Sequence, residues 1–188
     1  MYRLLEYDPA RRLPPACDLY ERATSLGGMS KSLALPGLRI GWLATRAPGL
    51  LARCQEYKDY TTICSSAPSE ILALMGLNAS ESILARNLEI IRTNLGLAAA
   101  FFERHAGLFR WLPPEAGSVA FPKWLGAERV EGFCRRMVEN QGVVAVPGAI
   151  FDYPGPHFRL GLGRRNFPQA LERFERGLPR AEEDLSGF

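Results

Sequence analysis

An α/β fold is predicted by the order in which strand-like and helix-like segments follow one another along the chain. Two short apolar segments with strand character come first, at about 23–26 and 38–44. A long helical pattern follows from about 79 to 107, and shorter strand and helix patterns then alternate up to about residue 178. Apolar residues make up 47% of the 188 positions and charged residues 23%, which is an ordinary composition for a globular protein.

The first part of the chain is expected to hold loops, two strands and two helices. Residues 1 to 22 contain three prolines and are predicted to be loop-like. The strand at about 38–44 is predicted to be buried, because apolar residues recur along it at Leu38, Ile40, Trp42 and Leu43. Pro48 suits the first turn of a helix, and a second helix is expected to begin near Ser69.

A long helix is predicted in the middle of the chain, with Asn78 and Glu81 as its capping pair. Its apolar stripe has gaps of four and three residues and consists of Leu84, Leu88, Ile91, Leu95, Ala98 and Phe102. A coiled coil would show a similar stripe, but this one is too short for sustained heptads. A helix that links two lobes is therefore the favoured interpretation.

The second part of the chain is predicted to be a small α/β unit. Its expected elements are a strand at Val119–Phe121, a helix at about 127–141 ending at Gly142, strands at 143–146 and 158–162, and a last helix that Asn166 caps with Gln169. The tail from Pro179 carries several acidic residues and is predicted to fray.

Charge and cysteine content exclude several classes of protein. The net charge of +3 is too small and too scattered to indicate nucleic-acid or membrane binding. The four cysteines (17, 54, 64 and 134) form no C-x-x-C pair, so no metal site is expected, and all four are predicted to be small buried thiols. The chain shows no membrane span and no signal peptide, which makes a cytoplasmic location the default expectation.

The strongest candidate for chemistry lies in residues 25 to 42, Ser-Leu-Gly-Gly-Met-Ser-Lys-Ser-Leu-Ala-Leu-Pro-Gly-Leu-Arg-Ile-Gly-Trp. Lys31 lies in a loop of small residues, which lets the backbone approach a ligand closely. Arg39 follows eight residues later, after a Pro-Gly turn. A guanidinium grips a phosphate with a planar fork, and its charge helps a nearby lysine to act as a nucleophile. A lone lysine in such a loop is usually only solvated, so the prediction depends on the whole segment.

This segment resembles the cofactor-binding segment of the class I/II aminotransferases, which are fold type I enzymes that use pyridoxal 5'-phosphate. The resemblance implies that Lys31 forms a Schiff base with the cofactor aldehyde and that Arg39 binds the cofactor phosphate. Gly28 stands where many members place a phosphate-binding serine, and its backbone amide is still able to donate to an anion. Ser25 or Ser30 is then left to replace the missing hydroxyl.

Two further residues gain a role from the same resemblance. Arg159, in His-Phe-Arg-Leu-Gly-Leu-Gly, matches the arginine that binds the substrate α-carboxylate, and the alternative is an ordinary solvent-exposed strand arginine. Tyr2 and Arg3 match the end of an Asp-x-x-Tyr-Arg motif whose tyrosine donates to the cofactor's phenolic oxygen. The alternative for Tyr2 is a disordered terminal tyrosine. Glu70 and His157 are expected to be surface or capping residues and receive no role.

The resemblance also implies a domain organisation. Residues 1–78 would be a remnant of the large cofactor-binding domain, 79–107 a long connecting helix, 108–180 a small C-terminal α/β domain and 181–188 a tail. The aspartate of the Asp-x-x-Tyr-Arg motif and the glycine-rich phosphate loop have no counterpart in the chain. A truncated enzyme with little activity on its own is therefore expected, because that aspartate strengthens the cofactor's electron-withdrawing ring.

The function implied by the resemblance is transfer of an amino group from an amino acid to a 2-oxo acid. Two alternatives stay open, since fold and cofactor do not fix the reaction. One is another fold type I reaction by a lyase, decarboxylase or cyclase, and the other is a non-catalytic remnant. The resemblance further implies a homodimer for the full-length protein, with amino acids and 2-oxo acids as its small-molecule partners.

Overall fold

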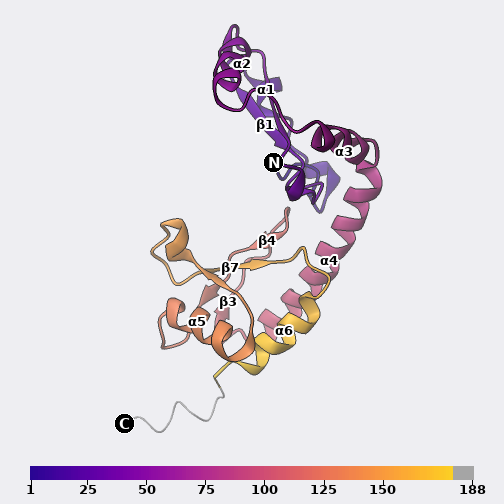
Figure 1. The fold of residues 1–188 in the computed structure, drawn as a ribbon. Coiled ribbons are helices and arrows are strands. Elements are labelled where there is room, and N and C mark those ends of the chain that lie inside the picture. Colours follow the sequence, from indigo (N-terminus) through magenta and orange to yellow (C-terminus); the bar gives the residue numbers. More distant parts are fainter. Residues whose placement is uncertain (180–188) are drawn as a thin grey trace. The chain divides into compact units, whose positions relative to one another are not determined.

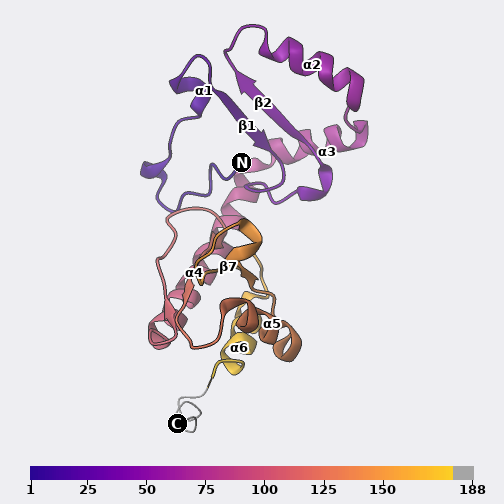
Figure 2. The same cartoon turned by 90° about the vertical axis from the view of Figure 1, so that its left-hand side faces the viewer.

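A computed structural model describes residues 1–179 of the chain, which form two compact units. The first unit holds Met1–Glu89 together with Glu115–Gly117, and the second holds Ile90–Pro114 and the chain from Ser118 onward. Figure 1 gives the order of the elements, and Figure 2 shows the sheet of the first unit from a second side. The predicted tail at 181–188 lies outside the described residues.

The sheet of the first unit is an antiparallel pair of strands, β1 (Thr24–Gly28) and β2 (Gly41–Thr45). In their register Gly27 lies opposite Trp42. A Cβ atom at position 27 would lie 2.2 Å from the indole of Trp42, so only glycine leaves room for that ring. The first strand is where the sequence predicts it. The second begins three residues later than predicted, because a 3-10 turn (Pro36–Leu38) and a left-handed residue, Arg39, come before it.

Helical elements come before and after this pair of strands along the chain. Short helical turns precede it, and two full helices follow it before the long helix begins. Helix α2 starts at Leu50, two residues after the proline that was expected in its first turn, and α3 starts close to the predicted Ser69. The elements are η1 (Pro9–Arg11), α1 (Ala16–Leu19), η2 (Pro36–Leu38), α2 (Leu50–Thr61), α3 (Ala67–Asn78) and α4 (Ser80–Arg104).

The core of the first unit lies between the turn after β1 and the helices that follow. Met29, Leu33 and Ala73 are buried at its centre. The prediction that the second strand is buried is wrong: Trp42 is 44% exposed and Leu43 is 43% exposed. Within the described residues β2 pairs only with β1, so its faces lack the covering layers that would bury a central strand.

The long helix α4 is confirmed, but its predicted cap is wrong. Asn78 is the last residue of α3, and Glu81 lies in the first turn of α4. Three residues of the predicted stripe are fully buried and the other three are half-buried. The buried set of α4 is Ile91, Asn94, Ala98, Phe101 and Phe102, so the stripe missed Asn94 and Phe101.

The second unit contains a three-stranded antiparallel sheet in the order β4-β7-β6. The sequence places β4 and β7 correctly, although each is shorter than predicted. The strand predicted at 143–146 is wrong except for Val146, because β6 is Val146–Pro147 and includes the proline that was expected in a turn. The sequence misses β3 and β5, which are too short to produce a periodic pattern. Asn166 flanks the last helix as predicted, but its side chain makes no capping hydrogen bond. The elements are β3 (Phe109–Arg110), β4 (Val119–Ala120), β5 (Lys123–Trp124), α5 (Val130–Gln141), β6 (Val146–Pro147), η3 (Gly148–Phe151), β7 (Phe158–Gly161) and α6 (Phe167–Arg176).

Aromatic rings form the core of the second unit. Phe101, Phe133 and Phe158 have no solvent-exposed surface. The indole of Trp124 stacks on Phe133 with ring centroids 4.0 Å apart. Large rings bury much apolar surface each, so a few of them suffice to hold a small unit together. These rings come from α4, α5, β5 and β7, and their contacts therefore join the sheets to the helices.

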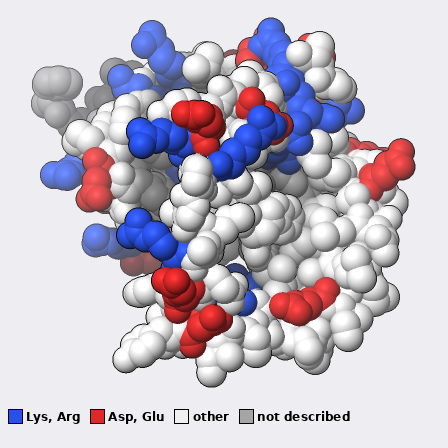
Figure 3. Space-filling model, turned by 90° about the horizontal axis from the view of Figure 1, so that it is seen from above, with Lys and Arg blue, Asp and Glu red and all other residues white. Residues whose placement is uncertain are grey.

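The four cysteines differ in their exposure to solvent. The prediction of four buried thiols is wrong for Cys64, which is exposed, and Cys134 alone among the four is fully buried. Figure 3 shows acidic and basic side chains near one another on the visible face, as expected from the small net charge. Among the described residues no helix combines the length and apolar character that a membrane span requires.

Candidate functional site

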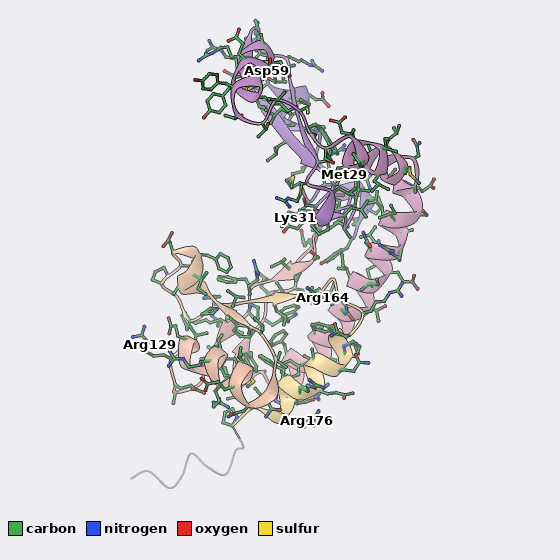
Figure 4. All side chains as sticks on the ribbon, viewed as in Figure 1. Met29, Lys31, Asp59, Arg129, Arg164 and Arg176 are labelled. Atoms are coloured by element: carbon green, nitrogen blue, oxygen red, sulfur yellow. The ribbon has the colours of Figure 1, made fainter. Side chains whose placement is uncertain are left out.

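The predicted lysine loop is a turn anchored in the core of the first unit. The Met29 side chain is fully buried, its amide donates to the Ile40 carbonyl at 3.1 Å, and its carbonyl accepts from the Leu35 amide at 2.9 Å. Lys31 lies two residues further along, and its side chain is exposed (Figure 4). The turn therefore holds the lysine backbone in place while its amine remains accessible.

Ser32 joins this turn to the start of the chain and to α4. It is 6% exposed, and its hydroxyl lies 2.9 Å from the Met1 carbonyl and 2.5 Å from the Arg3 carbonyl. The Asn87 side-chain amide donates to the Ser32 carbonyl at 2.9 Å. Ser32 and Asn87 were not predicted from the sequence, because a lone polar residue in each segment gives no pattern that predicts such a link.

The N-terminal segment brings Tyr2 to Lys31. The Lys31 Nζ atom lies 5.7 Å from the centroid of the Tyr2 ring, within the range of a cation–π contact. At this exposed position such a contact contributes only about 0.5–1 kcal/mol. The two predicted cofactor residues are thus neighbours in the first unit, although the sequence separates them widely.

Tyr7 helps to fix the same segment. Its hydroxyl donates to the Gly117 carbonyl at 2.7 Å, and its amide donates to the Glu115 carbonyl at 3.1 Å. Burial raises the pKa of Tyr7, which keeps the hydroxyl protonated and able to donate. These bonds explain why Glu115–Gly117 belong to the first unit although their neighbours in the chain belong to the second.

The other predicted cofactor residues lie around the turn. Arg39 is exposed and adopts a left-handed backbone conformation, and its Nη1 atom donates to the Pro36 carbonyl at 3.1 Å. Gly28 is buried at the end of β1, and Ser30 is half-buried next to Lys31.

A cavity of about 630 Å³ lies beside β1 in the first unit. Gly28 and Ser32 line it, together with Cys17 of α1 and Trp42 of β2. Lys31 and Arg39 are not among its lining residues. Within the described part of the chain, Gly28 and Ser25, the latter named above as a possible replacement for the missing hydroxyl, therefore line this cavity.

Arg159 belongs to the second unit and lies on β7, opposite Val146 of β6. It is exposed, and its guanidinium carbon lies 5.1 Å from the centroid of the Phe151 ring. A guanidinium stacked on a ring keeps its N–H donors free at the edge, where they are able to meet a carboxylate. Its exposure on β7 is compatible both with the predicted carboxylate role and with the alternative of an ordinary solvent-exposed strand arginine.

Comparison with known proteins assigns the family. The model of the family "Aminotransferase class I and II" matches residues 6–174. This match covers the antiparallel pair β1-β2 with its lysine turn, the long helix α4 and the small α/β unit. The chain belongs to the class I and II aminotransferase family.

Individual relatives agree with this assignment. Capreomycidine synthase of Streptomyces vinaceus is 29% identical over 181 residues, which cover 96% of this chain and 44% of the relative. A pyridoxal-phosphate-dependent aminotransferase from Streptococcus suis superposes with a TM-score of 0.86 at 28% identity, covering 95% of this chain and 46% of that one. The cyclase OrfR superposes with a TM-score of 0.74 at 31% identity, covering 81% of this chain and 42% of that one. The chain therefore spans less than half the length of these relatives.

Proposed function

We propose that this chain is the C-terminal part of an aminotransferase that uses pyridoxal 5'-phosphate to move an amino group from an amino acid to a 2-oxo acid. The single observation that carries the proposal is the approach of the Lys31 amine to the Tyr2 ring, at 5.7 Å. An accessible amine beside a phenol suits this chemistry, and the family match over residues 6–174 includes Lys31.

The residues of the first unit fit this cofactor. Lys31 offers an exposed amine to the aldehyde, and Tyr2, 42% exposed, offers a hydroxyl to the phenolic oxygen. Arg39 offers a guanidinium to the phosphate, with backbone amides near Gly28 and the Ser30 hydroxyl as further donors. When bound, the cofactor supplies an aldehyde carbon that exchanges with amino groups and a ring that withdraws electrons from the attached substrate.

In this proposal the side chains have separate tasks. The Lys31 amine would hold the cofactor and would move a proton at the substrate Cα. The Tyr2 hydroxyl orients the cofactor ring by donating a hydrogen bond. Arg159 receives the α-carboxylate with two parallel hydrogen bonds, which fixes the direction of the bound amino acid as well as its charge.

Reductive trapping tests the attachment point. The purified chain is mixed with pyridoxal 5'-phosphate, reduced with borohydride and mapped by mass spectrometry. The only lysines are Lys31, Lys58 and Lys123, so three sites compete. We expect the phosphopyridoxyl group on Lys31, no specific labelling in Lys31→Ala, and unchanged labelling of Lys31 in the matched control Lys58→Ala. Equal labelling of all three lysines would contradict the proposal.

Amino-group transfer is the second measurement. We expect the isolated chain to convert an amino acid and a 2-oxo acid slowly or not at all, because more than half of the length of its relatives has no counterpart in the 188 residues. Rapid transfer that disappears in Lys31→Ala would overturn the expectation of low activity and would support the assigned function. For the whole protein we further propose a cytoplasmic homodimer, which light scattering and cell fractionation test.

A cyclase is the second candidate. The observation that favours it is the 31% identity to a structure described as a pyridoxal-phosphate-dependent cyclase, together with the similarity to capreomycidine synthase. The same lysine, arginines and tyrosine would serve, since the scaffold does not fix the reaction. Mass analysis of the product distinguishes the two: transfer yields a 2-oxo acid, whereas cyclisation retains the substrate nitrogen atoms.

A further inference from the structure

Three aromatic side chains of the second unit form a compact group, which we call the β7 aromatic cluster: Phe121, Tyr153 and His157. The imidazole of His157 stacks on the Phe121 ring with centroids 5.2 Å apart and planes at 17°. The Tyr153 ring meets both edge-on, at 5.0 Å from His157 and 5.3 Å from Phe121. Such ring pairs stabilise a fold beyond the burial of their apolar surface.

His157 takes part in the β7 aromatic cluster through the faces of its ring. Its Nδ1 atom is buried and, within the described residues, has no hydrogen-bond partner. Burial, followed by the nearby charge of Lys123, lowers the pKa of His157, so the ring is neutral near pH 7. A neutral imidazole without a partner for Nδ1 contributes packing at this position and no charge.

The β7 aromatic cluster fastens the turn η3. A Cβ atom at Gly148, where η3 begins, would lie 3.1 Å from the Phe121 ring and 3.2 Å from the Tyr153 ring. The Gly148 amide also donates to the His157 carbonyl at 2.7 Å. Both ends of the turn are thus held, since Tyr153 lies two residues after the end of η3 and its amide donates to the Gly148 carbonyl at 3.1 Å.

Phe151 connects this turn to Arg159. It is the last residue of η3, and its ring lies 5.1 Å from the guanidinium carbon of Arg159. His157 and Arg159 are two residues apart on an extended segment, so their side chains leave the strand on the same side. The cluster, the turn and the arginine therefore form one continuous set of contacts.

We propose that His157 is a positioning residue: by holding η3 through Phe121 and Tyr153 it keeps the Phe151 ring against Arg159 and so orients the guanidinium for an α-carboxylate. The carboxylate role of Arg159 rests on the proposed function, whereas the orientation of its side chain does not. A ring of similar shape is sufficient at position 157, because neither Nδ1 nor a charge takes part.

The orientation is measured first, on the 188-residue chain without ligand. The Nε–H signal of Arg159 in a ¹H–¹⁵N spectrum is shifted by the Phe151 ring current and is assigned from its loss in Arg159→Gln. We expect His157→Ala to move this signal toward the value of a free arginine, and His157→Phe to keep it in place. Phe151 is 45% exposed, so Phe151→Ala should fold normally and reproduce the shift of His157→Ala even if that variant is unstable.

Binding is measured second, by titrating the same proteins with 2-oxoglutarate. We expect Arg159→Gln to lose about 10- to 100-fold in affinity. His157→Ala should lose about 3- to 10-fold, and His157→Phe should remain within about twofold of the unsubstituted chain.

The outcomes separate the proposed carboxylate role of Arg159 from the positioning role of His157. If Arg159→Gln binds as well as the unsubstituted chain, the proposed function of Arg159 fails while the positioning result from the spectra stands. If Arg159→Gln loses affinity but His157→Ala changes neither the signal nor the affinity, the positioning role is wrong. If His157→Phe behaves like His157→Ala, a polar role of the imidazole replaces the packing role proposed here.

Discussion

Asn94 offers the sharpest test of how the second unit holds its functional strand. It is 3% exposed in the middle of α4, and its side-chain amide donates to the Leu162 and Arg164 carbonyls, each at 2.8 Å. Leu162 directly follows β7, the strand that carries Arg159. One polar side chain therefore ties the end of that strand to the helix.

The replacement Asn94→Leu keeps a similar volume and removes both hydrogen bonds. The Leu162 carbonyl is buried and loses a partner, which costs about 1–3 kcal/mol. The Arg164 carbonyl is partly solvated and costs about 0.5–1.5 kcal/mol. The sum predicts a loss of about 1.5–4.5 kcal/mol in the free energy of unfolding.

Urea denaturation followed by tryptophan fluorescence measures this loss, with the exposed neighbour Thr93→Ala as the matched control. We expect the control to change the free energy of unfolding by less than about 0.5 kcal/mol. A loss below about 1 kcal/mol in Asn94→Leu would refute the reasoning, because it would mean that water replaces both bonds at no cost.

The variant Asn94→Asp tests the direction in which the stability changes with pH. A carboxylate would face two carbonyl oxygens, so its pKa in the folded protein should lie above that of the unfolded chain. The protonated acid is then favoured by folding, and the variant should lose further stability as the pH rises from about 4 toward 7. Equal stability at both ends of this range would contradict the geometry.

Three further predictions concern separate parts of the chain. Burial, followed by neighbouring acidic side chains, raises the pKa of Cys134 to about 12. Iodoacetamide at about pH 8 should therefore modify exposed Cys64 and leave Cys134 unmodified in the folded chain, which peptide mapping would measure. Hydrogen bonds from His105 and Arg104, at the end of α4, lower the pKa of Glu175. The Glu175 carboxylate therefore stabilises the fold above its pKa in the unfolded chain, and this stabilisation is lost as the pH falls through its pKa in the folded chain. Glu175→Gln should flatten this acid dependence of stability in a series of thermal melts. Gly27→Ala should destabilise the first unit by about 1–3 kcal/mol and by clearly less when Trp42→Val is also present, since the clash at 2.2 Å is with that indole.

Residues with a strong periodic pattern were predictable from the sequence. The apolar stripe of α4 and the Gly142 stop of α5 follow from helix geometry and backbone sterics, which act within a few residues of the chain. The start of β1 before Lys31 was predictable for the same reason, because small residues and a turn follow it directly. Local rules therefore locate the lysine turn.

Residues whose role depends on distant partners were not predictable. Ser32 is buried because it bonds the carbonyls of Met1 and Arg3, and Asn94 is buried because it bonds the end of β7. Neither partner lies within one turn of helix or one strand of its donor. Trp42 is the reverse case, an apolar residue that is exposed. Its apolar segment predicts burial, but burial needs a covering layer, and no local pattern reveals whether that layer is present.

The position of the unit boundary inside α4 has a consequence for cooperativity. Glu89 ends the first unit and Ile90 begins the second, so one continuous helix serves both. Helical segments shorter than about 12–15 residues are marginal in water without tertiary support, so loss of either unit should fray the helix from that side. Amide hydrogen exchange around Glu89 should therefore proceed at the rate set by whichever unit opens more readily.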